Sequence, residues 1–233
     1  MQNLSRLELI TNEETIRKIK EKNILLIGLG GVGGYTFETL VRSGIEKITI
    51  VDGDTFEESN LNRQVLSLTT TINNNKTDVA ESRAKEINPN VKITKITKIL
   101  TKENIYEINF NEYDYVIDAC DTMEIKKELI KITTRNNIKF ISSMGTGNKF
   151  HPELLEITTL DKTEYDPIAK ILRKYVKEEK INKKIKVVAS KEKPIKTNSK
   201  TIGSNAFVPG VAGMLLTSYV INDIVGEVWK YMI

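Results

Sequence analysis

The stretch Asn23–Gly33 (NILLIGLGGVG) decides the fold. Its first five residues form a short apolar run that ends at a glycine, which is typical of a buried strand. Helical spacing follows from Val32 to Ser43 and stops at Gly44, a residue suited to end a helix. A glycine-rich turn between a strand and a helix presents free backbone amides to phosphate groups. The predicted nucleotide-binding glycines are Gly28, Gly30, Gly31 and Gly33.

Strands and helices alternate on both sides of this stretch. Thr11-x-x-Glu14 resembles a capping box that opens a short helix before the first strand. Alternation of this kind predicts a parallel sheet with right-handed crossovers. The fold class predicted is therefore α/β, a Rossmann-like, mostly parallel sheet with flanking helices. The later elements are predicted as strands at 48–51, 91–96, 115–119 and 140–142 and helices at 77–87 and 123–135.

The pattern changes after Gly145-Thr146-Gly147. Two segments, 155–160 and 186–189, alternate like half-exposed strands and flank a basic helix at about 167–179. An apolar helix runs from about Pro209 onward. We therefore divide the chain into a nucleotide-binding half, 1–147, and a C-terminal mixed α/β extension, 148–233, within one continuous globular unit.

Composition argues against a secreted or membrane-spanning protein. No signal-peptide-like apolar stretch follows Met1, and the apolar run 207–225 is interrupted by Pro209, Asn222 and Asp223. Because a span needs about 20 mostly apolar residues, we expect a buried helix there and no membrane span. The single cysteine, Cys120, allows no internal disulfide and no Cys-x-x-Cys zinc pair, so a cytoplasmic location is expected.

Positive charge is concentrated in one segment. Between Lys170 and Lys200 twelve Lys or Arg residues stand against three acids, a local net of +9 in a chain of net +4, which leaves −5 elsewhere. Charge alone does not decide between a solvated lysine-rich face and a surface that contacts a phosphate backbone.

Cationic and acidic residues at strand ends point to a triphosphate rather than a dinucleotide. Asp52 ends the second strand, where it can accept hydrogen bonds from a ribose, and taken alone it would favour a nicotinamide dehydrogenase. A triphosphate, however, needs cations along its length and a carboxylate for magnesium. Arg63 and Lys76 supply the cations and Asp121 the carboxylate.

Each of these residues has an ordinary alternative role. Asp118 and Asp121 could cap the following helix, and Lys76 could be a surface lysine. Their joint occurrence, in order and at strand ends, is what favours an ATP–Mg²⁺ site.

Taken together, the glycine loop and the acidic, amide and cationic residues that follow it resemble the motif of the ubiquitin-activating-type adenylating superfamily, which includes sulfur-carrier adenylyltransferases. The resemblance implies that the first half binds ATP and catalyses adenylation, with Asp52 on the ribose, Arg63 and Lys76 on the phosphates and Asp121 on Mg²⁺. It further implies a homodimer in which Arg6 reaches the partner's ATP. The motif residues, all assigned to ATP binding or catalysis, are Gly28, Gly30, Gly31, Gly33, Asp52, Asp54, Asn60, Arg63, Gln64, Lys76 and Asp121.

The second half of the chain indicates which branch of this superfamily the chain resembles. Sulfur-carrier activators carry two Cys-x-x-Cys pairs, and ubiquitin-type activators carry a thioester cysteine. This chain has neither feature, because its only cysteine, Cys120, is predicted to be a buried residue at a strand end. Three segments instead resemble the tRNA threonylcarbamoyladenosine dehydratases: 161–167 (DKTEYDP), 188–194 (VASKEKP) and 203–213 (GSNAFVPGVAG). This family implies tRNA as substrate and partner. The residues expected to contact its backbone are Lys170, Arg173, Lys174 and Lys177.

The implied reaction is adenylation of a substrate carboxylate followed by intramolecular ring closure, which needs no enzyme thiol. Three alternatives stay open: an adenylyltransferase for a ubiquitin-like carrier protein, a nicotinamide dehydrogenase, and a nucleotide- or tRNA-binding protein without catalysis. The sequence also leaves open whether a monovalent cation (K⁺ or Na⁺) binds and whether a sulfur-transfer protein docks.

Overall fold

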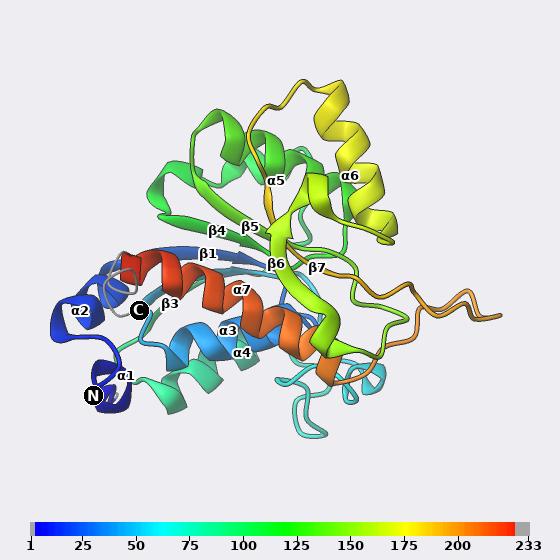
Figure 1. Ribbon diagram of the computed structural model, residues 1–233. Coiled ribbons are helices and arrows are strands. Elements are labelled where there is room, and N and C mark those ends of the chain that lie inside the picture. The colour runs from blue at the N-terminus through cyan, green and yellow to red at the C-terminus, as the bar shows by residue number, and fades with distance from the viewer. Residues whose placement is uncertain (1–2, 227–233) are drawn as a thin grey trace.

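A seven-stranded sheet forms the middle layer of the computed structural model, which describes residues 3–226 (Figure 1). The strand order is β3-β2-β1-β4-β5-β7-β6, and every pair is parallel except β6 with β7. The predicted α/β fold class is therefore confirmed. The strands are β1 (Asn23–Ile27), β2 (Lys47–Val51), β3 (Lys92–Ile96), β4 (Tyr115–Asp118), β5 (Lys139–Ser143), β6 (Leu155–Thr159) and β7 (Lys186–Ser190).

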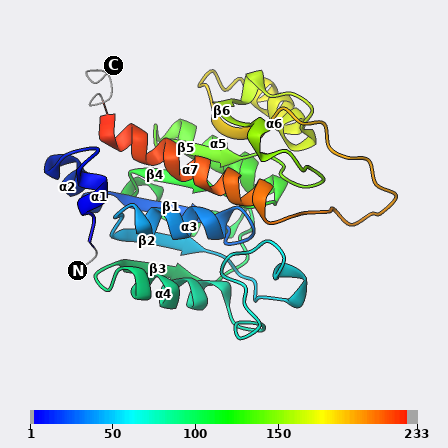
Figure 2. The ribbon, with the colours of Figure 1, turned by 60° about the horizontal axis from the view of Figure 1, so that its bottom comes forward.

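Apolar side chains on both faces of the central strands create two cores. In β1, Ile24 and Leu26 face one core while Leu25 and Ile27 face the other. The first core lies under α2 (Glu13–Glu21), α3 (Gly33–Arg42), α4 (Lys76–Ile87) and α7 (Phe207–Val225). The second lies under α5 (Met123–Arg135) and α6 (Pro167–Glu178), the helices that cover the other face of the sheet in Figures 1 and 2.

The C-terminal segment joins the sheet that the first half begins. Strand β7 extends the parallel sheet beyond β5, and β6 forms the antiparallel edge. Helix α7 packs against α3 so closely that a Cβ at Gly213 would lie 2.4 Å from the Val32 carbonyl oxygen. By length and composition α7 could cross a membrane, but 56% of its apolar window is buried inside the protein, as in a core helix.

The predicted helices and strands agree with these elements to within about two residues at their ends, apart from one cap. The cap of α2 is Asn12, whose side chain accepts a hydrogen bond from the Thr15 amide at 2.8 Å. The predicted cap, Thr11, is wrong because its hydroxyl donates instead to the Leu7 carbonyl at the end of α1 (Ser5–Glu8). The part of the terminal-helix prediction beyond residue 226, and residues 1–2 and 227–233 of the two predicted halves, lie outside the described residues.

Two glycines of the 28–33 loop are required by close backbone contacts. Gly28 has a φ of +90°, and a Cβ there would lie 2.8 Å from the Ala119 carbonyl oxygen. A Cβ at Gly33 would lie 1.8 Å from the Gly28 carbonyl oxygen. At Gly30, by contrast, a Cβ would meet no described atom within 4 Å. The loop can therefore close only with glycine at 28 and 33.

The substitution Gly33→Ala should lower the free energy of unfolding by about 3 kcal/mol, because the added methyl forces the β1–α3 turn apart. Urea unfolding followed by circular dichroism measures this loss. Gly30→Ala is the matched control and should change the free energy by less than about 1 kcal/mol. Equal unfolding midpoints for the two variants would contradict the steric account.

Candidate functional site

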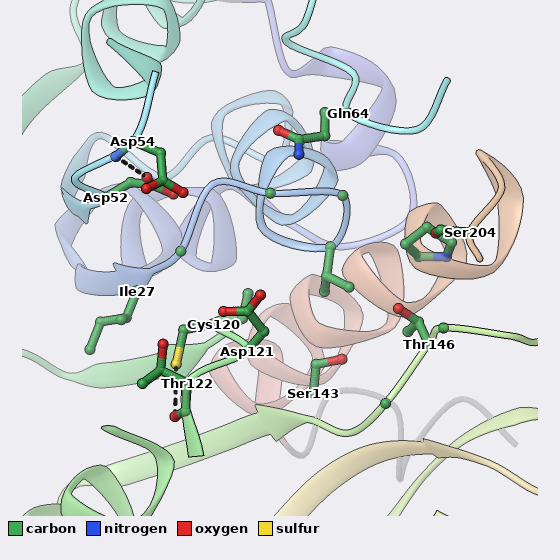
Figure 3. A pocket seen from close by; sticks show the side chains of 18 of the residues that line it. Ile27, Asp52, Asp54, Gln64, Cys120, Asp121, Thr122, Ser143, Thr146 and Ser204 are labelled. Atoms are coloured by element: carbon green, nitrogen blue, oxygen red, sulfur yellow. Dashed lines mark hydrogen bonds between the residues drawn. The ribbon is translucent and has the colours of Figure 1, made fainter. Parts of the chain in front are cut away.

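A pocket of about 920 Å³ opens where the carboxyl ends of β1, β2, β4 and β5 meet (Figure 3). The chain leaves β1 toward β2 on one side and β4 toward β5 on the other, so the pocket lies where the strand order reverses. Open parallel sheets bind ligands at such a point, because the strand-end loops part there.

Most residues of the predicted ATP site lie together in the wall of this pocket. Gly33 does not, since it lies buried beneath the glycine loop, and Asp118 is also wholly buried under the pocket floor. The residues of the predicted set that line the pocket are Gly28, Gly30, Gly31, Asp52, Asp54, Asn60, Arg63, Gln64, Lys76 and Asp121.

Asp52 is held by two backbone amides at the end of β2. Its carboxylate accepts hydrogen bonds from the Leu29 amide at 2.7 Å and the Asp54 amide at 2.9 Å. Burial raises the pKa of Asp52, and the nearby Lys76 charge and these two amides offset the rise only in part. The carboxylate therefore links the glycine loop to the β2–α4 connection.

Lys76 begins α4 and is a buried residue, only 6% exposed, rather than the surface lysine of the alternative interpretation. Its ammonium lies 2.9 Å from an Asp54 carboxylate oxygen and 3.8 Å from one of Asp52. A bridge between Thr55 and Asn75 closes the long β2–α4 connection and brings this lysine to the pocket.

Arg63 and Gln64 follow a short 3-10 turn, Glu58–Asn60, that the Asn60 side chain stabilises by accepting from the Glu57 amide. The Arg63 guanidinium donates to the Ser59 carbonyl at 2.6 Å. Gln64 lines the pocket with its buried Oε1 lacking a hydrogen-bond partner among the described residues. Since buried acceptors are almost always satisfied, this atom indicates a place for a ligand or water donor.

Asp121 is exposed, and its carboxylate points across the pocket toward the glycine loop (Figure 3). It does not cap α5, whose N-cap, Thr122, makes no capping hydrogen bond through its side chain. Among the described residues no cluster of three His, Cys, Asp or Glu side chains could hold a metal alone. A single carboxylate facing a phosphate pocket nevertheless fits Mg²⁺, which commonly takes its other ligands from phosphates and water.

A buried ion pair that sequence reasoning missed lies at the floor of the pocket, which Lys126 helps to line. The Lys126 ammonium is 2.8 Å from an Asp118 carboxylate oxygen and donates to the Ser143 carbonyl at 2.8 Å. Burial lowers the pKa of Lys126, but the Asp118 charge and hydrogen bond outweigh it and leave the pKa raised. The pair ties the end of β4 to the end of β5. The sequence signal that could have revealed this pair is a lysine on the apolar face of the predicted helix 123–135.

A second missed ion pair lies at the far end of the pocket, between Lys149 and Asp166 at 3.2 Å. Asp166 also accepts from the Gly145 amide at 2.9 Å and caps α6 through the Ala169 amide. Both charged residues sit in loops, so no periodicity or spacing in the sequence could have paired them.

The remaining predicted residues lie outside the pocket. Arg6 is exposed on α1, at the amino ends of the strands and away from the pocket (Figure 1). Lys170, Lys174 and Lys177 are exposed along α6, which starts at the pocket wall. Arg173 is partly buried, and its guanidinium donates to the Thr163 carbonyl at 2.8 Å. It therefore does not share the exposed surface of the three lysines.

Comparison with known proteins gives consistent matches. The ThiF family model matches residues 2–226. The chain is 35% identical to the tRNA threonylcarbamoyladenosine dehydratase of Bacillus subtilis, over 96% of this chain and 95% of that protein. It is 34% identical to the dehydratase of Escherichia coli, over 71% of this chain and 62% of that one. The crystal structure of E. coli tRNA N6-threonylcarbamoyladenosine dehydratase in complex with ATP superposes with a TM-score of 0.90 at 27% identity, covering 98% and 96% of the two chains.

The Cys120 thiol lines the pocket beside Asp121, yet it is poorly suited to act as a nucleophile. Burial and then the charge of Asp118, whose oxygen lies 3.0 Å from the sulfur, raise the pKa of Cys120 well above its usual value. Its thiolate fraction at neutral pH is correspondingly small.

Alkylation of Cys120 by iodoacetamide should be slow at pH 7, because only the thiolate reacts. The rate should keep rising with pH beyond about 8.5, where an ordinary thiol levels off. Mass spectrometry of quenched samples measures the rate, and the same protein in urea is the control that should level near the ordinary pKa. A folded-state rate that levels at or below that pH would show that the thiol is activated.

Proposed function

The chain belongs to the ThiF family, and from this premise we propose that it is a tRNA threonylcarbamoyladenosine dehydratase, which uses ATP to cyclise the modified adenosine beside the anticodon. The observation that carries the proposal is a match over 96% of this chain and 95% of such a dehydratase, in a chain whose Arg63, Lys76 and Asp121 converge on one pocket. Cys120 is the only cysteine in the chain, so the chain lacks the zinc-binding cysteine pairs and the additional thiol that would favour a carrier-protein activator.

ATP would lie across the carboxyl ends of β1 and β2. Asp52 would accept hydrogen bonds from the ribose, and the amides of the glycine loop would face the phosphates. The Lys76 ammonium, already held near two carboxylates, and the Arg63 guanidinium would balance the phosphate charge. Asp121 would hold Mg²⁺, which supplies charge neutralisation at the phosphates.

In the first step a carboxylate oxygen of the substrate attacks the α-phosphorus of ATP. A bond forms between that oxygen and phosphorus while the bond to the bridging oxygen breaks, so pyrophosphate leaves and an acyl adenylate remains. Arg63 and Lys76 stabilise the charge that develops on the transferring group. Because these cations are already oriented by neighbouring oxygens, little rearrangement is needed during the step.

In the second step a nitrogen or oxygen of the carbamoyl group attacks the activated carbonyl carbon. The ring closes, the attacking carbamoyl group releases a proton, AMP leaves with the former carboxylate oxygen, and the nucleoside has lost one water overall. Nucleophile and electrophile belong to the same side chain, so their effective concentration is high without an enzyme nucleophile. The raised thiol pKa of Cys120 agrees with such a route.

The tRNA backbone would lie along α6, whose exposed lysines extend from the pocket wall. We further propose a cytoplasmic homodimer in which Arg6 acts at the partner's pocket, which agrees with its distance from the pocket of its own chain. A monovalent cation and a docked sulfur-transfer protein have no part in the two steps above, and both stay predictions from the sequence.

The reaction is tested by incubating the protein with ATP, Mg²⁺ and tRNA that carries threonylcarbamoyladenosine. Mass spectrometry of the digested nucleosides should show the loss of one water that depends on ATP. Asp121→Ala and Arg63→Ala should each lower turnover at least about a hundredfold, because the first removes the carboxylate that would hold Mg²⁺ and the second removes a cation that faces the phosphates. Glu124→Ala, which removes an exposed acid outside the pocket wall, is the matched control and should keep activity.

An unchanged nucleoside together with adenylation of a carrier protein would overturn the proposed function. Full activity of either the Asp121 or the Arg63 variant, with the control also active, would refute that residue's role.

The α6 surface is tested by replacing Lys170, Lys174 and Lys177 with alanine. The slope of log Kd for tRNA against log salt should flatten by about one for each lysine that contacts a phosphate. A matched triple variant at the exposed Lys18, Lys92 and Lys102, away from the pocket, has the same net charge and should keep the slope. Equal slopes for the two triple variants would show that the α6 lysines face solvent and do not contact the tRNA backbone.

A further inference from the structure

Two aromatic groups that the adenylation chemistry does not use stand next to residues of the pocket wall in the chain, and we call them the rim aromatics. The Tyr165 side chain is 51% exposed and directly precedes Asp166, a residue of the pocket wall. Phe150 is 59% exposed and directly follows Lys149, also in the wall.

Tyr165 is paired with a cation. The Lys193 ammonium lies 4.8 Å from the centre of the tyrosine ring, and Lys193 itself precedes the wall residue Pro194. The backbone of Tyr165 has a φ of +50°, in the left-handed region that bulky residues rarely adopt. Strain of this kind persists where neighbouring contacts hold it, and it is often found at binding sites.

Phe150 forms the second group together with Phe207, the first residue of α7. Their ring centres are 5.0 Å apart and their planes meet at 81°, an edge-to-face arrangement. Phe207 is 40% exposed and stands two residues before Pro209 in the pocket wall. The edge contact supports the Phe150 ring while leaving much of it open.

A hydrogen bond and an ion pair connect the two aromatic groups to each other and to the pocket wall. The buried Glu192 carboxylate accepts from the Phe150 amide at 2.9 Å, and Glu192 is the residue before Lys193. On the other side, Asp166 is joined to Lys149, the residue before Phe150. The spacing of both groups around the pocket is therefore set before any ligand arrives.

We propose that Tyr165 with Lys193, and Phe150 with Phe207, are stacking sites for the two bases that flank the target adenosine. This inference rests on the proposed function. An adenosine whose side chain reaches the pocket must leave its stack, and its neighbours then expose their faces. Unpaired bases are bound by stacking on aromatic rings, and a nearby cation suits the adjoining phosphate. The occupant is thus single-stranded RNA, in agreement with the +9 charge of the 170–200 segment.

The test uses the full-length protein and an anticodon stem-loop RNA that carries threonylcarbamoyladenosine with 2-aminopurine at one flanking base or the other. Binding should quench the 2-aminopurine fluorescence. Tyr165→Ala should weaken the quenching at one flank and raise Kd about tenfold, and Phe150→Ala should do the same at the other flank. The salt slope should stay unchanged, because stacking releases no counterions.

Control variants separate stacking from folding. Tyr165→Phe keeps the ring and should bind like the parent, and Tyr165→Leu keeps bulk without a flat ring and should bind like Tyr165→Ala. Tyr106→Ala removes another tyrosine, 56% exposed, that lies away from the pocket wall and should have no effect. Unchanged ATP affinity reports an intact fold in every variant.

Parent-like affinity and quenching in both Tyr165→Ala and Phe150→Ala would overturn the stacking sites. So would a Tyr165→Phe variant that binds as weakly as Tyr165→Ala. Ring closure by the parent protein on the same RNA is followed in parallel. If the parent converts the RNA while both alanine variants bind it normally, the stacking proposal fails alone; if the parent neither binds nor converts it, the proposed function fails.

Discussion

The Gly28 carbonyl oxygen lies 1.8 Å from the position that a Cβ of residue 33 would occupy, and the rest of the pocket depends on this contact. It lets the chain turn from β1 into α3 within a few residues, so the amides of the loop face the pocket. Gly28 also lies against the backbone of Ala119, which brings the end of β4 beside the same loop. Asp121 and the glycine amides consequently face each other across one cavity (Figure 3).

Charged pairs hold the other walls in place. Lys76 joins the β2 end to α4, Lys126 joins the ends of β4 and β5, and Lys149 joins the β5 loop to α6. The Lys126–Asp118 and Lys149–Asp166 pairs are buried on both sides, so removing one partner of either leaves an uncompensated charge that costs about 3–5 kcal/mol, whereas the Asp54 partner of Lys76 is exposed. The phosphate-facing cations Arg63 and Lys76 are oriented in advance by the Ser59 carbonyl and the Asp54 carboxylate, which is the condition for effective electrostatic catalysis.

Much of the fold could be predicted because its signals are local. The apolar run 23–27 and its glycine turn, and the periodicity of helix 123–135, can be read directly from adjacent residues. The convergence of Asp52 and Asp121 followed from strand ends meeting at one edge of a parallel sheet, and Lys76 joins them from the start of the next helix. The Lys149–Asp166 pair and the rim aromatics could not be predicted, because they depend on how irregular loops cross in space. The α2 cap was misassigned because Thr11 and Asn12 are both good capping residues, and only the path of α1 decides between them.

The central claim is that this pocket transfers AMP to a carboxylate of the modified nucleoside. The direct measurement supplies tRNA whose threonylcarbamoyladenosine carboxylate is labelled with ¹⁸O and analyses the released nucleotides by mass spectrometry. Attack on the α-phosphorus predicts one ¹⁸O in AMP and none in pyrophosphate. Label in inorganic phosphate released with ADP would mean that the γ-phosphorus is attacked instead, and it would contradict the account.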